Sequence, residues 1–376
     1  MVTQELNTYM DQHREEAFAL LLELAQIPAP SNQEQKRAEF CREWLARQGA
    51  EGVYIDEALN VVYPVGCEEG KEIVVFAAHS DVVFPDTEQL PLEMEDGRIY
   101  CPGVGDDTAN VVALLMTAKL IAEHKLCPDG VGVMLVVDAG EEGLGNLKGI
   151  RHLMSQYGSR IREFIALDGQ QRAGVNRAVG SRRYRIWVET EGGHSYGNFG
   201  NRNAIACLAA VIDDLYRAEV PALGKTTYNV GTVKGGTSVN TIAQYAEMLY
   251  EFRSDEREAM EIMQRYLDRV LETHRADGVS IGISLVGERP CGGDVNPVSQ
   301  EKLEERVRQA SLRCYGLDLT FGPGSTDCNI PLSMGIPAVC VGCYQGHGAH
   351  TRQEYVEIDS LLPGLYYARD LVLGYF

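Results

Sequence analysis

The sequence is short of basic residues: 34 lysines and arginines stand against 54 aspartates and glutamates, which gives a formal net charge of −20. A protein with this much negative charge repels phosphate backbones and anionic lipid headgroups, so we expect neither nucleic acid nor a membrane surface as its partner. The same charge keeps a globular protein in solution, and this ordinary effect is the simplest explanation of the acidity.

A long apolar run is also missing. No stretch approaches the roughly 18 consecutive apolar residues that span a bilayer, and residues 1–16 are too polar for a secretory signal. The ten cysteines are scattered apart from Cys340 and Cys343, and no second close pair completes a zinc site with them. We therefore expect a cytoplasmic protein with reduced cysteines, and we interpret Cys340 and Cys343 as buried thiols of a strand.

The length of 376 residues exceeds what one hydrophobic core usually supports, so two domains are expected. The apolar pattern predicts one helix over residues 4–27, then a second helix that begins at a capping box of Ser31 and Glu34 and ends at Gly49. Strand and helix patterns alternate from there to about residue 180 and resume further along the chain. This alternation predicts an α/β fold with a mostly parallel sheet flanked by helices.

Residues 182–288 have a different pattern of secondary structure, with six predicted elements in the order β-α-β-β-α-β. That order is typical of a ferredoxin-like α+β unit. The economical interpretation is a discontinuous catalytic domain, formed by residues 1–181 and 289–376, into which a smaller domain of residues 182–288 is inserted.

Acidic residues and histidines stand at the ends of several predicted strands. In an open α/β sheet, ligands bind outside the carboxyl ends of the strands, so side chains placed there share one rim. The residues at these strand ends, or just ahead of a helix, are His79, Asp81, Asp106, Asp107, Glu141, Glu142, Asp168 and His350. We predict that they form one site.

Charge balance indicates what this site binds. Six carboxylates around two histidines would repel one another and oppose folding, and no lysine or arginine lies within these motifs. Two divalent cations about 3.5–4 Å apart would neutralise the cluster, and such pairs recur in hydrolases. A mixture of imidazole and carboxylate suits zinc best, with cobalt or manganese as alternatives.

Each motif alone has an ordinary explanation. A His-x-Asp pair is commonly structural, paired glutamates at a strand end are usually solvated, and two aspartates before a helix form a favourable N-terminus. Asp168 before Gly169 has the pattern of a turn. A metal centre is favoured because these four motifs and the loop of His350 are all expected at one edge of the sheet.

Nine short motifs, in order along almost the whole chain, resemble one known family: "HSD", "GDD", "GEEG", "LDG", "GGHS", "GGTSVN", "EFR", "GSTD" and "AHT". The family is that of the dinuclear zinc peptidases and deacylases, which includes peptidase T, carboxypeptidase G, aminoacylase and succinyl-diaminopimelate desuccinylase. The chain is most similar to its peptidase T-like members. The resemblance implies a zinc exopeptidase-like fold whose inserted domain serves as a lid and as a dimerisation domain.

The resemblance also implies roles for the residues at the rim. His79 and Asp168 would bind one metal, Glu142 and His350 the other, and Asp106 would bridge the two. Asp81 would orient the imidazole of His79. Glu141 would be the general base that activates the water and the acid that protonates the leaving amine. The peptide bond between Asp106 and Asp107 is often cis in this family. Thr108 and Asn110 depart from the lysine and glycine that the family often has after the aspartate pair.

In the inserted domain, the resemblance makes His194 the residue that stabilises the oxyanion, often from the partner subunit of a homodimer. Asn240 and Arg253 would bind the carboxylate or nearby polar groups of the substrate, although a salt bridge explains Arg253 about as well. Ser325 would lie near the substrate. His347 is a rival to His350 as ligand, but only His350 stands in the "AHT" motif.

We therefore predict a metal-dependent amide-bond hydrolase with two divalent ions. Asp168 resembles the peptidase T and dipeptidase branch, which favours an exopeptidase acting on di- or tripeptides. The alternative is an N-acyl-amino-acid amidohydrolase, and a remote alternative is a non-catalytic binding protein on the same fold.

Overall fold

The computed structural model describes residues 4–275 and 278–376. The chain forms two compact units. The first comprises residues 1–178 and 293–376, and the second comprises residues 179–292. The first unit is therefore discontinuous in sequence, and the second is a continuous segment inserted into it.

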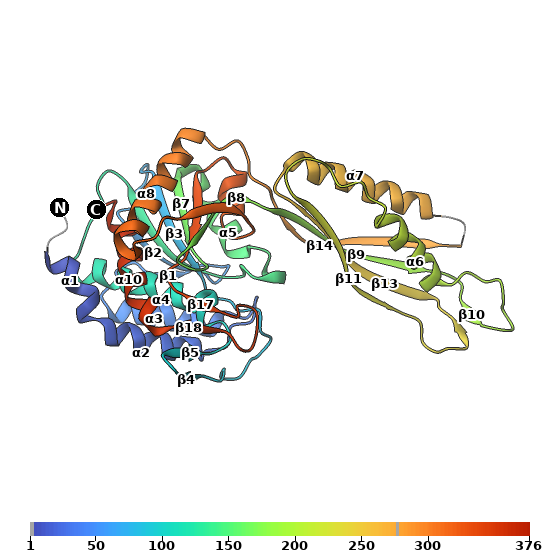
Figure 1. The fold of residues 1–376 in the computed structure, drawn as a ribbon, viewed down its shortest axis with the longest axis horizontal. Helices are drawn as coiled ribbons and strands as arrows, with labels where there is room; N and C mark the ends of the chain where they lie inside the picture. Colours follow the sequence, from blue (N-terminus) through green and yellow to red (C-terminus); the bar gives the residue numbers. More distant parts are fainter. Residues whose placement is uncertain (1–3, 276–277) are drawn as a thin grey trace. The chain divides into compact units, whose positions relative to one another are not determined.

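An eight-stranded sheet forms the centre of the first unit (Figure 1). Its order is β1 (Tyr54–Ile55), β2 (Val61–Val65), β6 (Gly132–Asp138), β3 (Ile73–His79), β7 (Ile161–Leu167), β16 (Ala338–Val341), β8 (Ala173–Ala178) and β15 (Thr320–Gly324). The four central strands, β6, β3, β7 and β16, are parallel, whereas β2 and β8 run antiparallel to their neighbours β6 and β16. The predicted α/β fold with a mostly parallel sheet is confirmed.

Strand β3 shows why the central strands of this sheet have continuous apolar runs in their sequences. Val74 and Phe76 pack into one buried cluster, while Val75 and Ala77 pack into another on the opposite face. Both faces are therefore covered by helices, as parallel sheets require. One face carries α1 (Gln4–Gln12), α2 (Arg14–Ala25), α3 (Gln35–Arg47), α4 (Asn110–Glu123), α8 (Pro297–Tyr315) and α10 (Ile358–Leu373), and the other carries α5 (Lys148–Tyr157) and α9 (Asn329–Ser333).

Two predictions at the amino-terminal side are wrong. The helix predicted over residues 4–27 is divided into α1 and α2 at His13, whose ring nitrogen Nδ1 lies 2.9 Å from the carbonyl oxygen of Tyr9. The capping box of Ser31 and Glu34 does not form, because α3 begins at Gln35 and has no side-chain cap. The Ser31 hydroxyl instead donates to Asp81, 50 residues along the chain.

The second unit is a four-stranded antiparallel sheet with two helices. The elements follow in the order β9 (Gly180–Glu189), α6 (Ala204–Leu215), β11 (Thr226–Gly235), β13 (Tyr245–Ser254), α7 (Arg257–His274) and β14 (Ser280–Arg289). The sheet order is β11-β13-β9-β14, and α6 and α7 share one buried cluster with its inner face. This is the predicted ferredoxin-like arrangement. A short ribbon of β10 (Gly193–His194) and β12 (Thr241–Ile242) extends it.

Two smaller features of the first unit support the candidate site. A tight helical turn, Val104–Ala109, precedes α4 and carries the two adjacent aspartates. The strands β17 (Gly346–His347) and β18 (Tyr355–Glu357) pair with each other and enclose the loop of His350, and β18 continues into a small sheet with β5 (Arg98–Tyr100) and β4 (Glu93–Glu95). None of the described helices combines the length and apolar character that crossing a bilayer requires.

Candidate metal centre and active site

His79 is the last residue of β3 and is almost fully buried. Its ring is oriented by Asp81: Nδ1 lies 3.1 Å from the Asp81 carbonyl oxygen and 3.5 Å from the carboxylate oxygen Oδ1. The other ring nitrogen, Nε2, lies 3.1 Å from Oδ1 of Asp106. The strand end therefore directs one imidazole nitrogen, Nε2, toward the carboxylate of Asp106.

Asp106 faces both histidines. Its Oδ1 lies against Nε2 of His79, and its Oδ2 lies 3.1 Å from Nε2 of His350. A carboxylate that presents its two oxygens to two imidazoles in this way has the geometry of a bridge between two cation positions. The peptide bond from Asp106 to Asp107 is cis, as the family resemblance implied.

His350 approaches from the loop between β17 and β18, and its backbone is in the left-handed region, with φ of 64°. Its Nε2 lies 2.9 Å from Oε1 of Glu142, which follows β6. His350 is also the most exposed of the predicted ligands, with 57% of its side chain accessible. The group formed by Asp106, Glu142 and His350 therefore lies at the open side of the cluster.

The acidic residues and histidines form three overlapping groups. Within each group, every side chain has one potential metal-donor atom, and these donor atoms all lie within 4.8 Å of one another. The groups are His79 with Asp106, Asp107 and Asp168; Asp106 with Glu142 and His350; and His79 with Glu141 and Glu142. The structure therefore brings all five predicted ligands together. It adds Asp107, which stood in the motif without an assigned role.

The cluster strongly perturbs the pKa values of its members. Hydrogen bonds with Asp106 and Glu142 raise the pKa of His350 to about 10. Burial acts to lower the pKa of His79, but the neighbouring carboxylates of Asp107 and Asp106 raise it well above its usual value. Burial raises the pKa of Asp168 to about 6. Without a cation, the two imidazoles hold protons and supply the positive charge that the carboxylates require.

The residues present fit divalent cations. In the part of the chain that the structure describes, the ion pairs of Asp81, Asp106 and Glu142 are all with histidines, so no arginine or lysine neutralises these three carboxylates directly. Imidazole nitrogen combined with carboxylate oxygen is the donor set of zinc and related ions. A bound cation would replace the imidazole protons, because histidine coordinates a metal only in its neutral form.

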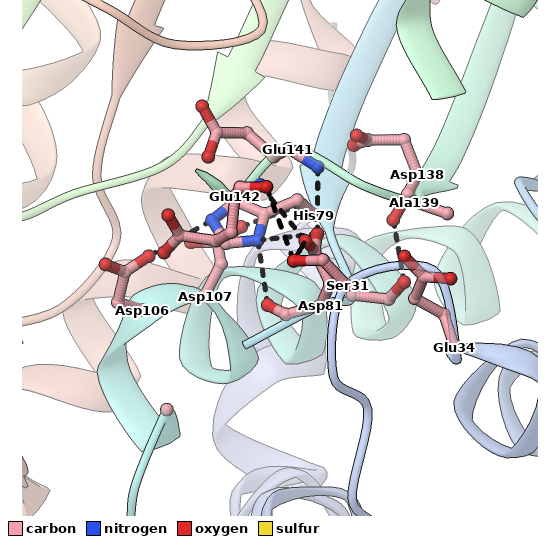
Figure 2. Close-up of polar contacts among 12 residues, drawn as sticks. Ser31, Glu34, His79, Asp81, Asp106, Asp107, Asp138, Ala139, Glu141 and Glu142 are labelled. Atoms are coloured by element: carbon pink, nitrogen blue, oxygen red, sulfur yellow. Dashed lines mark hydrogen bonds and ion pairs between the residues drawn. The ribbon is translucent and has the colours of Figure 1, made fainter. Parts of the chain in front are cut away.

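Asp81 connects the histidine to the segment of the predicted general base (Figure 2). Its carboxylate accepts the backbone N–H groups of Glu141 at 2.9 Å and of Glu142 at 3.0 Å. It also accepts the hydroxyl of Ser31 at 2.6 Å. The carboxylate side chain of Glu141 points away from Asp81 in Figure 2. Asp81 therefore fixes the backbone from which Glu141 and Glu142 project.

Three of the predicted residues lie in the second unit. His194 and Asn240 are close together, because the N–H of Ser195 donates to the carbonyl of Asn240 at 3.0 Å. Nδ1 of His194 accepts the N–H groups of Tyr196 and Gly197, each at 3.2 Å. In the neutral ring the proton must then be on Nε2, which makes this nitrogen a hydrogen-bond donor.

Arg253 lies near the opposite end of β13 from the ribbon that carries His194. It is partnered across the ladder by Ser181, next to the start of β9. Its guanidinium donates to both carboxylate oxygens of Glu251, at 3.0 and 3.1 Å. The salt bridge considered for Arg253 is present, and the predicted substrate residues Arg253 and Asn240 therefore lie at different ends of this unit.

The remaining candidates lie in the first unit. Ser325 is half-buried directly after β15 and begins the turn that contains Asp327. His347 is exposed on β17 and belongs to none of the donor groups found among the described residues. Cys340 and Cys343 are buried, free thiols, and Sγ of Cys340 donates to the carbonyl of Asp168 at 3.3 Å.

Comparison with known proteins gives the family. The model of peptidase family M20/M25/M40 matches residues 75–374. The chain belongs to this family. The resemblance seen in its motifs is thereby confirmed, and the protein is an enzyme of a hydrolase family.

Its relatives have several activities. Succinyl-diaminopimelate desuccinylase of Corynebacterium glutamicum is 27% identical over 92% of this chain and 92% of its own length. Acetylornithine deacetylase of Myxococcus xanthus is 26% identical over 79% of this chain and 78% of its own. A tripeptidase of Staphylococcus aureus has the same fold, with a TM-score of 0.76 and 22% identity over 95% of this chain and 97% of that one.

Sequence reasoning assigned no structural role to several residues that shape this site. Glu354 accepts the N–H groups of Gly103, Gly105 and Asp106 at 2.7–2.9 Å and so holds the turn of the two aspartates. Asp138 and Asp327 form a buried carboxyl pair. These partners are 189 or more residues apart in the chain. Only Asp138 carries a local signal, a charged residue at the end of an apolar run, whereas Glu354 and Asp327 lie in polar segments.

Proposed function

We propose that the protein is a metal-dependent amide-bond hydrolase, and that it acts as an exopeptidase on di- or tripeptides. The observation that carries the proposal is the convergence of His79, Asp106, Glu142, Asp168 and His350 into overlapping donor groups. A cluster of this composition is costly to keep buried unless cations neutralise it. Membership of a peptidase family supports amide hydrolysis as the reaction.

His79 and Asp168 would hold one divalent ion, Glu142 and His350 the second, and Asp106 would lie between them. Zinc is the ion that we propose, with cobalt or manganese as alternatives. When bound, such ions lower the pKa of a water molecule and polarise the scissile carbonyl. A solved Bacillus subtilis protein of the same fold, which is 17% identical with a TM-score of 0.67, is described as a dinuclear metal-binding peptidase. This description supports the proposed number of ions.

Glu141 is the proposed general base. It lies next to the ligand Glu142, it is 5% exposed, and its backbone is fixed by Asp81. Its carboxylate takes a proton from the attacking water and delivers it to the nitrogen of the leaving amine, which separates once it is protonated. Asp81 remains charged and can therefore keep accepting the backbone N–H groups of Glu141 and Glu142. Burial acts to raise the pKa of Asp81, but the hydrogen bond from His79 lowers this pKa below its usual value.

The second unit supplies the proposed contacts to the substrate. His194 donates from Nε2 to the oxyanion that develops on the scissile carbonyl, and its tautomer supports this role. Asn240 and Arg253 bind the carboxylate or neighbouring polar groups of the substrate, and Ser325 of the first unit borders the substrate. Because Arg253 is already paired with Glu251, substrate binding by Arg253 requires it to share or exchange that partner.

We also propose a homodimer formed through the second unit, with His194 acting on the site of the partner subunit. Strand β11 is an edge of its sheet and therefore has unpaired backbone groups that a second copy can bind. Ile205 of α6 and Val233 of β11 are exposed apolar residues of this region. Tyr196 and Phe199, which follow His194 in sequence, are 89% and 91% exposed. Apolar exposure of this extent is typical of an interface.

The alternative substrate class is an N-acyl amino acid. It is favoured by the curated relatives, a desuccinylase and a deacetylase, each 26–27% identical. The exopeptidase interpretation depends on Asp168 and agrees with the tripeptidase that shares this fold. Both classes present an amide beside a carboxylate, so the same machinery serves either. All ten cysteines are free, which supports the proposed cytoplasmic location.

One experiment tests the reaction and the substrate class together. The enzyme is loaded with zinc, cobalt or manganese and assayed on di- and tripeptides beside N-acetyl and N-succinyl amino acids, with mass spectrometry identifying the released end. We expect peptides to be cleaved, and the Glu141→Ala variant to bind metal while its kcat falls by about 10²–10⁴-fold.

Turnover of acylated amino acids alone would replace the exopeptidase with the deacylase. Full activity of Glu141→Ala would refute the proposed base. Absence of bound metal in active wild-type enzyme would refute the metal centre. A protein that binds metal and every substrate but turns over none would be the non-catalytic binding protein.

A further inference from the structure

Asn110 is a buried side chain whose hydrogen bonds all lead to the segments that carry the proposed ligands. It is the first residue of α4 and is 0% exposed. Its Nδ2 group donates to Oδ1 of Asp107 at 2.5 Å and to the carbonyl of Gly169 at 3.2 Å. Its Oδ1 accepts the N–H of Cys343 at 2.7 Å.

Each partner adjoins a different part of the metal centre. Asp107 follows Asp106, the proposed bridge, and its other carboxylate oxygen accepts the backbone N–H of His79 at 3.0 Å. Gly169 follows the proposed ligand Asp168. Cys343 begins the segment that leads from β16 to His350. One amide therefore joins the Val104–Ala109 turn to the segments that follow β7 and β16, three parts of the chain that are remote from one another in sequence.

The chemistry of the amide group explains why these contacts need this residue. Asparagine offers two donor hydrogens and an acceptor oxygen on one planar group, and the three contacts use both kinds. A carboxylate of the same size keeps the acceptor but loses the donors. An aliphatic side chain loses both, and would leave the buried N–H of Cys343 without this acceptor.

Helix α4 gives this amide a fixed position. All residues from Asn110 to Ala122 are buried, and the helix packs against β3, β6, β7 and α10. A group on a rigid, buried helix holds its partners with less positional scatter than a group on a loop. Turns and loops carry the segments that it binds, so their relative placement depends on such a group.

We propose that Asn110 is a positioning residue that sets the separation of the two cation positions. It holds the Asp106–Asp107 turn, the end of β7 and the start of the His350 segment at fixed distances from one another. The inference rests on the proposed metal centre and deepens it. Partners of this kind, one step removed from the ligands, typically contribute 10–100-fold to metal affinity.

The test compares Asn110→Asp and Asn110→Ala with a matched control, Thr117→Val. Thr117 lies two turns further along the same face of α4, is also 0% exposed, and its hydroxyl donates only within the helix, to Ala113 at 2.9 Å. Valine has nearly the shape of threonine. The control therefore removes a buried hydrogen bond of the same helix without touching a segment that carries a ligand.

Metal-free proteins are first compared by thermal unfolding, and Co²⁺ is then titrated by calorimetry while the visible absorption spectrum is recorded. We expect wild type and Thr117→Val to bind two ions with the same affinities and spectra. We expect Asn110→Asp and Asn110→Ala to bind at least one ion about 10–100-fold more weakly, with a changed spectrum. Asn110→Asp preserves the volume and decides the matter if Asn110→Ala does not fold.

Wild-type affinities and spectra in a folded Asn110→Asp protein would overturn the inference while leaving the metal centre intact. So would losses of the same size in Thr117→Val, because the effect would then belong to the stability of α4. A wild-type protein that binds no Co²⁺ would instead refute the proposed function. The three results are distinguishable in one titration series.

Discussion

At the scale of single residues, Asp138 and Asp327 form a buried carboxyl pair beside the proposed metal centre. Both are buried, at 0% and 2% exposure. Within residues 4–275 and 278–376, no other group donates to either carboxyl oxygen of Asp138 or to Oδ1 of Asp327, although the two carboxyl groups lie within hydrogen-bonding distance of each other. Burial raises the pKa of Asp138 to about 7, and burial with the charge of Asp138 raises the pKa of Asp327 well above its usual value. A proton held between them satisfies both.

We predict that Asp138→Asn makes the metal-free protein more stable at pH 8. The folded-state pKa of Asp138 is above the unfolded value, so the native state binds more protons between about pH 4 and pH 7, and this group makes unfolding easier as the pH rises through that window. Asparagine removes this loss and donates to Asp327. The expected gain in the free energy of unfolding is about 2–4 kcal/mol.

Denaturant unfolding of both proteins with EDTA, at pH 5 and at pH 8, measures the effect of Asp138→Asn. The two proteins should differ more at pH 8 than at pH 5. An equal difference at the two pH values would show that Asp138 does not hold an extra proton in the folded state.

Some residues of the candidate site could be predicted from the sequence, and others could not. His79, Asp106, Glu142, Asp168 and His350 could be proposed because each is a polar residue that ends an apolar strand or stands in a compact motif. Partners such as Glu354 could not, since a glutamate that accepts backbone N–H groups of a turn 248–251 residues away looks like any other glutamate in sequence.

At the scale of elements, the turn Val104–Ala109 depends on Glu354. Three backbone N–H groups of residues 103–106 donate to its carboxylate, and Glu354 itself is 1% exposed. The turn presents Asp106 to both histidines, so a single acceptor supports the shape of a ligand-bearing element. Tyr344 adds to the restraint, since a methyl group on Gly105 would lie 2.6 Å from its ring.

We predict that Glu354→Ala lowers the free energy of unfolding by about 2–4 kcal/mol, because it leaves buried N–H groups without an acceptor. Glu43→Ala serves as a control, since its surface ion pair with Arg42 is worth at most about 1 kcal/mol. Urea unfolding of the metal-free proteins provides the measurement. Equal, small losses in both variants would contradict the role of Glu354.

Elements with strong internal patterns were predictable, and those set by distant partners were not. The strands β3 and β6 are buried throughout and are apolar up to their last residues, His79 and Asp138, because both faces of the sheet are covered, so their sequence identifies them directly. Ser31 shows the opposite case. Its local sequence pattern predicts a helix cap, but its hydroxyl donates to the carboxylate of Asp81 instead. The local sequence around Ser31 cannot indicate a competing acceptor that is 50 residues away.

At the scale of the whole molecule, the proposed homodimer makes a prediction about hybrid enzymes. If His194 serves the partner's site, His194→Ala and Glu141→Ala are each inactive alone for different reasons. A hybrid of the two has one site in which both residues are intact. A hybrid purified through both tags should therefore recover up to about half of the wild-type activity, and the unfractionated co-expressed mixture up to about one quarter if the subunits assort randomly.

Activity of the tagged hybrid, relative to each purified parent, measures this exchange. The double variant His194→Ala with Glu141→Ala, co-expressed with itself, is the control for background activity. An inactive hybrid that is shown to contain both tags would place His194 on its own subunit's site.

The insertion of the second unit between residues 178 and 293 determines the order in which the parts become available during synthesis. By the time residue 292 has been made, the inserted unit is complete, whereas its host still lacks β15, β16 and α10. Of the five proposed metal ligands, His350 is the last to leave the ribosome. A nascent chain can therefore finish its second unit first, but it acquires a fully formed metal centre only after translation has passed that histidine.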